Sequence, residues 1–203
     1  MTLIQRAGGL DFCIRPATSD RNTVLSCAEF DEYEIVGMDL RGKMVLDVGA
    51  HIGGFAVLAA RLGARVVAVE PVPENVELLR RNAELNGLQD QIIVVDGAVG
   101  LGELRLYWDY KGNPNVETHA YIGSVVPADD AHPPSDITYR EMLVPGYTLD
   151  DLVSRFGPFS LAKLDCEGGE WDLLAPPGVV VLPLLVGEWH PTMGRTRDEF
   201  AKL

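Results

Sequence analysis

Three acidic residues each stand directly after a short apolar run of the sequence. They are Asp47, Glu70 and Asp96. Carboxylates accept hydrogen bonds from hydroxyl and amino groups, and they attract cations. If the apolar runs are neighbouring buried strands, the three acids gather at one edge of a sheet. Their spacing therefore predicts a site for a ligand that carries hydroxyl groups and positive charge.

The elements that hold these acids alternate between buried strands and amphipathic helices. Apolar runs at 44–46, 66–69 and 92–95 predict strands, and the intervening segments 53–62 and 71–86 have the apolar spacing of helices. Continuous apolar strands joined by helices are typical of a parallel sheet covered on both faces. We therefore expect an α/β fold with a doubly wound, Rossmann-like, mostly parallel sheet. Its ligand should lie beyond the carboxyl ends of the strands.

The turn after the first strand indicates which ligand this is. A dinucleotide-binding turn has the pattern G-x-G-x-x-G, which lets the backbone approach a pyrophosphate. Residues 49–54 read G-A-H-I-G-G, so His51 replaces the middle glycine, and the charge of Asp47 would repel phosphate. S-adenosylmethionine (SAM) carries no phosphate but has an ammonium and a sulfonium group, which favours SAM as the cofactor. A dehydrogenase with degenerate glycines is the alternative.

Each acid then has an expected contact with SAM. We expect Asp47 to bind the positive charges directly or through water. Glu70 is expected to accept hydrogen bonds from both ribose hydroxyls, and Asp96 from the adenine amino group. The predicted cofactor-binding residues are Asp47, Gly49, Ala50, His51, Gly53, Glu70, Pro71, Asp96, Gly97, Ala98 and Asp165.

Several motifs, in order along the chain, resemble the FkbM family of methyltransferases. They are VLDVGAHIG at 45–53, VEP at 69–71, YTLDDL at 147–152, KLDCEGGE at 163–170 and EWHP at 188–191. The resemblance covers about residues 30–191. It implies a class I SAM-binding fold and, often, O-methylation of sugars or natural products. His51 stands where the family commonly has Asn, which keeps a polar group near the cofactor.

Asp165, Glu167 and His190 are the candidate catalytic residues. Methyl transfer from a sulfonium is an in-line displacement, in which the enzyme aligns donor and acceptor and a base removes a hydroxyl proton. The two acids follow a predicted strand at 161–164, beside the expected methyl group, and His190 follows another at 184–186. Alternatively, the acids contact the cofactor or cap a helix, and His190 is a structural histidine. We expect no metal, because no tight cluster of metal ligands stands out.

Composition limits the partners. The formal net charge of the 203 residues is -13, and an acidic surface repels phosphate backbones. We therefore expect a small-molecule acceptor and no nucleic acid. Three cysteines without close spacing predict reduced thiols and a cytoplasmic protein. The sequence lacks a signal-peptide pattern and a run of about 18 apolar residues, so we expect no membrane contact.

The chain divides into an N-terminal extension and one SAM-binding domain. Residues 1–43 are expected to cover the cofactor, with a small strand at 10–15 and a helix at 20–30. Residues 44–203 form the methyltransferase domain, with a long loop or hairpin insertion at about 103–147. The chain ends where a last helix begins. We therefore expect the final antiparallel strand pair to be missing, through truncation or because the sheet edge is completed otherwise.

Three functions remain open at this level. A SAM-dependent O-methyltransferase of small molecules is the leading hypothesis. A methyltransferase that acts on nucleic acid or protein is the second, although the asparagine/aspartate-Pro-Pro-Tyr signature of amino methylation is absent after residue 164. The third is a non-catalytic SAM-binding module in a homo-oligomer, because an incomplete sheet leaves an edge that another chain could cover.

Overall fold

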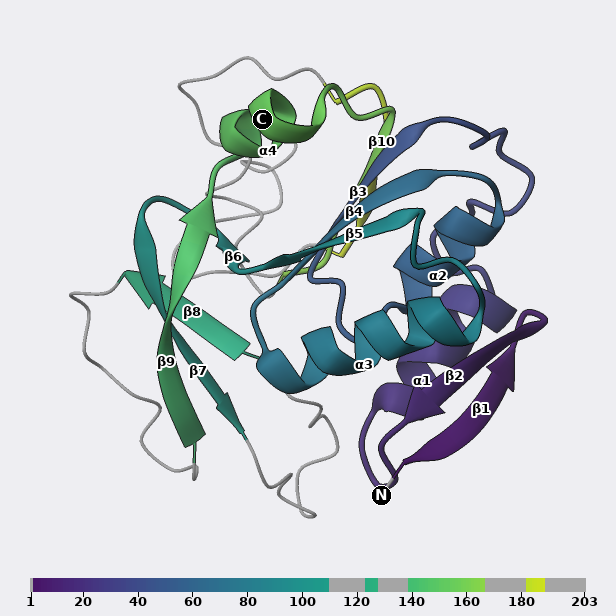
Figure 1. Cartoon of the computed structure of the whole chain (residues 1–203), viewed down its shortest axis with the longest axis horizontal. Coiled ribbons are helices and arrows are strands. Elements are labelled where there is room, and N and C mark those ends of the chain that lie inside the picture. Colours follow the sequence, from purple (N-terminus) through teal and green to yellow (C-terminus); the bar gives the residue numbers. More distant parts are fainter. Residues whose placement is uncertain (1, 110–122, 128–138, 167–181, 189–203) are drawn as a thin grey trace.

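A five-stranded parallel sheet forms the centre of the computed structural model, which describes residues 2–109, 123–127, 139–166 and 182–188 (Figure 1). Its strands are β3 (Met44–Val48), β4 (Arg65–Glu70), β5 (Ile92–Asp96), β10 (Leu161–Leu164) and β11 (Leu185–Gly187). Their order is β11-β10-β3-β4-β5, and every pair is parallel. The predicted α/β fold with a mostly parallel sheet is confirmed.

The strand order reverses between β3 and β10. From β3 the chain adds β4 and β5 on one side, and later adds β10 and β11 on the other. Ligands of such sheets bind beyond the carboxyl ends of the strands at this reversal. The register pairs Lys163 of β10 with Asp47 of β3, one residue before the end of each strand. The reversal therefore places a lysine beside the first of the predicted acids.

Helices cover both faces of the sheet, as expected of a doubly wound fold (Figure 1). Helices α2 (Gly54–Arg61) and α3 (Pro73–Leu85) lie on one face, and α4 (Leu149–Phe156) lies on the other. Strand residues alternate between these layers: Val45 belongs to the α2 side, and Leu46 to the α4 side. Helix α4 begins with a capping box, in which Thr148 and Asp151 each accept a hydrogen bond from the other's backbone N–H.

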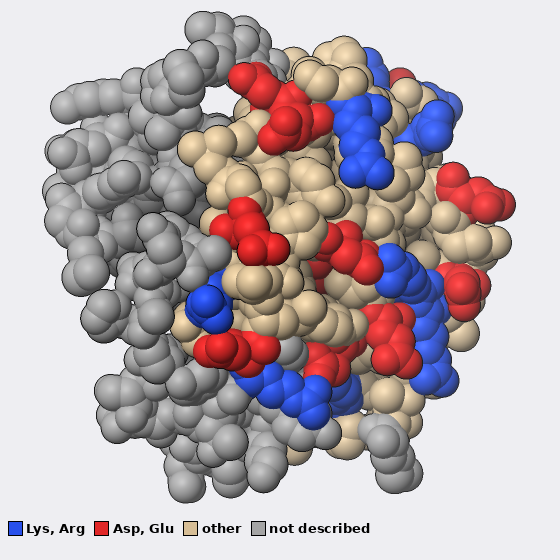
Figure 2. Space-filling view, turned by 60° about the vertical axis from the view of Figure 1, so that its left-hand side comes forward, with Lys and Arg blue, Asp and Glu red and all other residues tan. Residues whose placement is uncertain are grey.

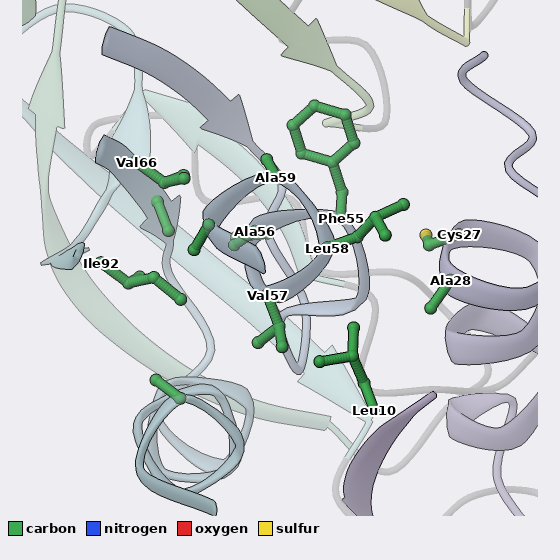
Figure 3. Close-up of a cluster of buried hydrophobic side chains, with 14 of the residues drawn as sticks. Leu10, Cys27, Ala28, Phe55, Ala56, Val57, Leu58, Ala59, Val66 and Ile92 are labelled. Atoms are coloured by element: carbon green, nitrogen blue, oxygen red, sulfur yellow. The ribbon is translucent and has the colours of Figure 1, made fainter. Parts of the chain in front are cut away.

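Helix α2 is buried almost all round. Every residue from Gly54 to Ala60 is buried, because the sheet covers one side and the N-terminal segment covers the other. Figure 3 shows Leu10, Cys27 and Ala28 on the side of α2 away from Val66 and Ile92. The N-terminal elements are β1 (Leu3–Ala7), β2 (Leu10–Ile14), α1 (Asp20–Val24) and a π-helical turn, η1 (Leu25–Glu29). A helix that is apolar on all sides needs such a double cover.

A second, four-stranded sheet has the order β6-β9-β7-β8 (Figure 1). Its strands are β6 (Ala98–Val99), β7 (Glu103–Asp109), β8 (Gly123–Pro127) and β9 (Tyr139–Tyr147). Strands β7, β8 and β9 lie within the segment of about 103–147 that the sequence predicts as a long loop or hairpin insertion. The five residues of β8, GSVVP, begin with Gly and end with Pro, so the local signal is weak and pairing with β7 decides the conformation.

Asn82 of α3 and Asn86, the residue that caps the end of this helix, bond β2 in the way that a neighbouring strand would. Asn86 accepts a hydrogen bond from the N–H of Asp11 and donates to its carbonyl. One turn earlier, Asn82 makes the same pair of bonds with Cys13. Asn82 also donates to the carbonyl of Ile52, 2.9 Å away, in the turn that precedes α2. Asn82 therefore ties the N-terminal hairpin to the predicted cofactor turn.

Replacing Asn82 with Ala is expected to lower the free energy of unfolding by about 3 kcal/mol, because three buried backbone groups lose their partner at once. Asn86→Ala is the matched control. It is expected to cost about 1 kcal/mol, since Asn86 is only half-buried and water can replace it. Urea denaturation of both variants measures the difference. Equal losses of unfolding free energy in the two variants would contradict a stabilising role for the hydrogen bond between Asn82 and Ile52.

Candidate active site

A cavity of about 230 Å³ lies where β3 and β10 end. The predicted site residues Gly49, Ala50, His51 and Asp165 line it, so the fold brings these four together. The opposite wall comes from the N-terminal segment between residues 22 and 33. The cavity thus joins the strand reversal to the segment that the sequence predicts as a cofactor cover.

The turn after β3 passes close to the end of β10. Gly49 has a φ of 74°, and a Cβ atom there would overlap the backbone carbonyl of Asp165. Only glycine suits this approach. The N–H groups of Gly49 and Ala50 both donate to the carbonyl of Val69, which fixes the turn to β4. His51 follows with a left-handed backbone, at a φ of 51°.

Lys163 is a buried cation at the centre of the site. Its Nζ donates to the carbonyl of Gly49 at 2.8 Å and lies 3.3 Å from Asp47 Oδ1 and 3.6 Å from Asp165 Oδ2. Burial by itself would lower the pKa of Lys163, but the two carboxylates outweigh burial and raise it. Lys163 is therefore a permanent ammonium group. Asp47 is fully buried beneath it and is not part of the cavity wall.

Tyr33 connects the N-terminal segment to Asp165. Its hydroxyl donates to Asp165 Oδ2 at 3.2 Å, and its ring lies edge-on to Phe55 with 5.5 Å between centroids. Lys163 Nζ lies 5.7 Å from the centroid of the same ring, within cation–π range. Burial, and then the charge of Asp165, raise the pKa of Tyr33. Tyr33 therefore stays protonated and remains a donor to Asp165.

Glu70 is buried and accepts hydrogen bonds from three donors of the protein. Its Oε1 accepts from the N–H of Val72 and the amide of Asn75, both at 3.0 Å, and its Oε2 accepts from the N–H of His51 at 2.8 Å. A carboxylate has about four acceptor positions, so Oε2 retains one. Glu70 therefore keeps some acceptor capacity, and its contact with the ribose hydroxyls stays a prediction.

The bonds of Glu70 continue into a closed ring of buried polar groups. Asn75 accepts from Arg15 Nη2 at 2.7 Å, and Arg15 forms a two-point ion pair with Asp20. Asp20 Oδ1 lies 3.4 Å from His51 Nε2, which returns the ring to the turn. Burial would raise the pKa of Asp20, but the Arg15 guanidinium and then His51 hold it below its usual range. The ring joins the N-terminal segment to the turn and to α3.

The remaining predicted residues either do not line the cavity or lie outside the described residues. Gly53 precedes α2 with a φ of 90°. Asp96 is exposed and pairs with Arg80 at 2.6 Å, and a Cβ on Gly97 would overlap the carbonyl of Pro145. Pro71 lies between Glu70 and α3, and Ala98 is buried in the second sheet. Their contacts with SAM stay predictions. Glu167 and His190 lie outside the described residues.

Sequence reasoning missed the polar residues that support the site. They are Arg15, Asp20, Tyr33, Asn75 and Lys163. Lys163 did leave a signal, because it is the only charged residue in an otherwise apolar strand, where a lysine is buried only with a partner. The others come from segments with no distinctive spacing, so their convergence on the turn could not be read from the sequence.

Comparison with known proteins identifies the family. The model of the methyltransferase FkbM domain matches residues 47–203, which is most of the chain. This chain belongs to the FkbM methyltransferase family. The assignment confirms the resemblance seen in the sequence, and with it SAM as the cofactor. A methyltransferase family also rules out the dehydrogenase alternative.

Similarity between this FkbM chain and curated proteins is confined to short segments. The ubiquinone biosynthesis O-methyltransferase of Methylocella silvestris is 51% identical over 49 residues, which cover 24% of this chain and 19% of that protein. The ribosomal protein L11 methyltransferase of Chloroflexus aurantiacus is 38% identical over 68 residues, or 33% of this chain and 21% of that protein. The chain thus matches about a fifth of the length of these two relatives.

A solved structure of a tRNA (uracil-54, C5)-methyltransferase from Pyrococcus abyssi, in complex with S-adenosyl-L-homocysteine, resembles part of the FkbM chain. The TM-score is 0.39 and the identity 19%, and the match covers 50% of this chain and 26% of that one. Nothing about the acceptor follows from a likeness of this extent.

The residues present fit SAM better than a dinucleotide. The His51 side chain occupies the turn where a pyrophosphate would need bare backbone, and its two ring nitrogens, although buried, make no hydrogen bond among the described residues. His51 lines a cavity that Glu32, Asp165 and Glu188 also line, and its Nε2 lies 3.4 Å from Asp20 Oδ1. A ligand with hydroxyl groups and positive charge supplies partners for both kinds of group, and SAM has both.

Lys163→Met is expected to lower the free energy of unfolding by about 3–5 kcal/mol, because it leaves Asp47 buried without a counter-charge. The double variant Asp47→Asn, Lys163→Met should recover part of that loss, since neither charge of the pair remains. Urea denaturation measures both. A double variant no more stable than Lys163→Met would contradict the coupling.

Low pH should lower the free energy of unfolding, in part through His51. Burial lowers the pKa of His51 to about 4, from 6.5 for a free imidazole. Between these values the unfolded chain binds a proton that the folded chain does not, so stability falls as the pH drops from 6.5 to 4. His51→Asn accepts the left-handed backbone and has no charge to gain. This variant should lose up to about 3 kcal/mol less than wild type between pH 7 and pH 4 in urea titrations. Identical pH profiles would contradict this account.

Proposed function

We propose that this FkbM chain is a SAM-dependent O-methyltransferase whose acceptor is a small molecule that carries a hydroxyl group. The observation that supports it is the cavity at the strand reversal, with a turn unsuited to pyrophosphate on one side and acids around it. Family membership supplies the reaction class. The O-methyltransferase named for ubiquinone biosynthesis among the relatives favours a small hydroxyl acceptor.

The residues of the chain then have distinct tasks. When bound, SAM supplies an electrophilic methyl group, which passes to the acceptor oxygen while the sulfonium leaves as a neutral thioether. Glu70 binds one ribose hydroxyl through Oε2, and the ring of Arg15, Asp20 and Asn75 keeps that carboxylate in place. The N-terminal segment supplies one wall of the cavity. Asp165, Glu167 and His190 are the candidates that take the hydroxyl proton.

The surface favours a small acceptor over a nucleic acid. On the face in Figure 2, basic side chains lie beside acidic ones. Arg80, Arg105 and Arg140 each form an ion pair with a neighbouring Asp or Glu. Such pairs, together with a net charge of -13, repel a phosphate backbone more than they attract it. We propose that neither DNA nor RNA is the acceptor.

A cytoplasmic location is part of the proposal. Cys13, Cys27 and Cys166 are free thiols, as expected in a reducing compartment. In the described part of the chain, no helix has the length and apolar character that a membrane span requires.

The protein is expected to bind S-adenosylhomocysteine, the product of the reaction, with one-to-one stoichiometry in isothermal titration calorimetry. Glu70→Gln keeps the shape but removes the charge that accepts a ribose hydroxyl, so its affinity should fall at least about tenfold. Circular dichroism checks that the variant is folded. Unchanged affinity in a folded variant would remove Glu70 from the cofactor site.

Filter binding of bulk tRNA at low salt tests the acceptor class, and tight binding there would overturn the small-molecule assignment.

A further inference from the structure

Lys163 already occupies the groups at the end of β3 that could receive a cation. Its ammonium lies 3.3 Å from the carboxylate of Asp47 and 2.8 Å from the carbonyl oxygen of Gly49. Asp47 is fully buried, so a ligand cannot reach it without displacing Lys163. The ammonium group of SAM therefore needs an acceptor other than Asp47, which the sequence assigns to the positive charges of SAM.

Two carboxylates reach the cavity from opposite walls. Asp165 comes from the end of β10, where the Tyr33 hydroxyl donates to its Oδ2. Glu32 comes from the N-terminal segment, where the Cys27 thiol donates to its Oε1 at 3.3 Å. Each acid thus accepts a hydrogen bond from a neutral donor, and Asp165 Oδ2 also lies 3.6 Å from the Lys163 ammonium group. Burial raises the pKa of the Cys27 thiol well above its usual range, so it remains a donor.

The charges around the cavity favour a cation between these acids. Glu32, Asp165 and Glu188 line the cavity, and Lys163 is its only basic lining residue among the described residues. The charge of Lys163 is shared between Asp47, which lies outside the cavity wall, and Asp165, so the three lining acids outweigh it. A net negative cavity next to a sulfonium site suits the ammonium end of an amino acid and disfavours a second anion.

We propose that Glu32 of the N-terminal segment, together with Asp165, binds the α-ammonium group of SAM. The inference rests on the proposed function, because it assigns residues to one end of that cofactor. It makes the N-terminal segment part of the binding site itself. Glu32 contacts the ligand directly, and Tyr33 is a positioning residue that acts through Asp165.

Calorimetry with two ligands tests this assignment. S-Adenosylhomocysteine carries the ammonium group, whereas 5′-methylthioadenosine has the same nucleoside and sulfur but lacks the amino-acid part. Glu32→Gln should lower the affinity for S-adenosylhomocysteine about tenfold, because a charged hydrogen bond is lost. Its affinity for 5′-methylthioadenosine should stay within about twofold of wild type. Glu34→Gln is the matched control, since Glu34 is exposed, carries the same charge and does not line the cavity. It should change neither affinity.

The outcomes separate the two proposals. Unchanged S-adenosylhomocysteine affinity in Glu32→Gln would overturn the role of Glu32 and leave the cofactor assignment intact. Equal weakening of both ligands would also overturn it, because the effect would then be structural. Equal losses in Glu32→Gln and Glu34→Gln would show a general charge effect and no contact. If wild type bound neither ligand, the proposed function itself would fail, and this inference with it.

Discussion

The ammonium group of Lys163 is the interaction on which the site depends. A buried lysine is tolerated only where opposite charge and carbonyl oxygens surround it, and the register of β10 against β3 provides both. The same contacts hold the Gly49 turn against the end of β10 and keep Asp47 out of the cavity. The charge of Asp47 at the end of the central strand is thus balanced by Lys163 within the protein, and the acids available to a ligand are those that line the cavity.

A second constraint links the N-terminal segment to this centre. The ring that runs from Glu70 through Asn75, Arg15 and Asp20 to His51 has its polar atoms in a largely buried layer, where each unpaired group would be costly. Asn82 adds a neutral link between the hairpin and the turn. The segment before β3 is therefore held by directional bonds as well as by apolar contact with α2. These bonds fix the distance between the two walls of the cavity.

This arrangement explains how an acidic FkbM protein can bind a cofactor that is itself positively charged. Acids that serve structure, Asp47 and Asp20, are neutralised by Lys163 and Arg15 inside the protein. Acids that line the cavity also accept hydrogen bonds from neutral donors: Glu32 from the Cys27 thiol, and Asp165 from the Tyr33 phenol in addition to its contact with Lys163. Neutral donors orient a carboxylate without cancelling its charge, so the acids that line the cavity retain an attraction for a cation.

The sequence by itself determined the parallel sheet, the helices at 53–62 and 71–86 and the turn at 49–54, because apolar periodicity and helix ends are local signals. It also placed Gly49, His51 and Asp165 at the strand ends, where the structure gathers them. Only the tertiary structure decided that Lys163 pairs with Asp47, that protein donors fill most of Glu70, and that Tyr33 reaches Asp165. Those contacts join residues far apart in the chain, and strand register and helix packing, which no local pattern encodes, bring them together.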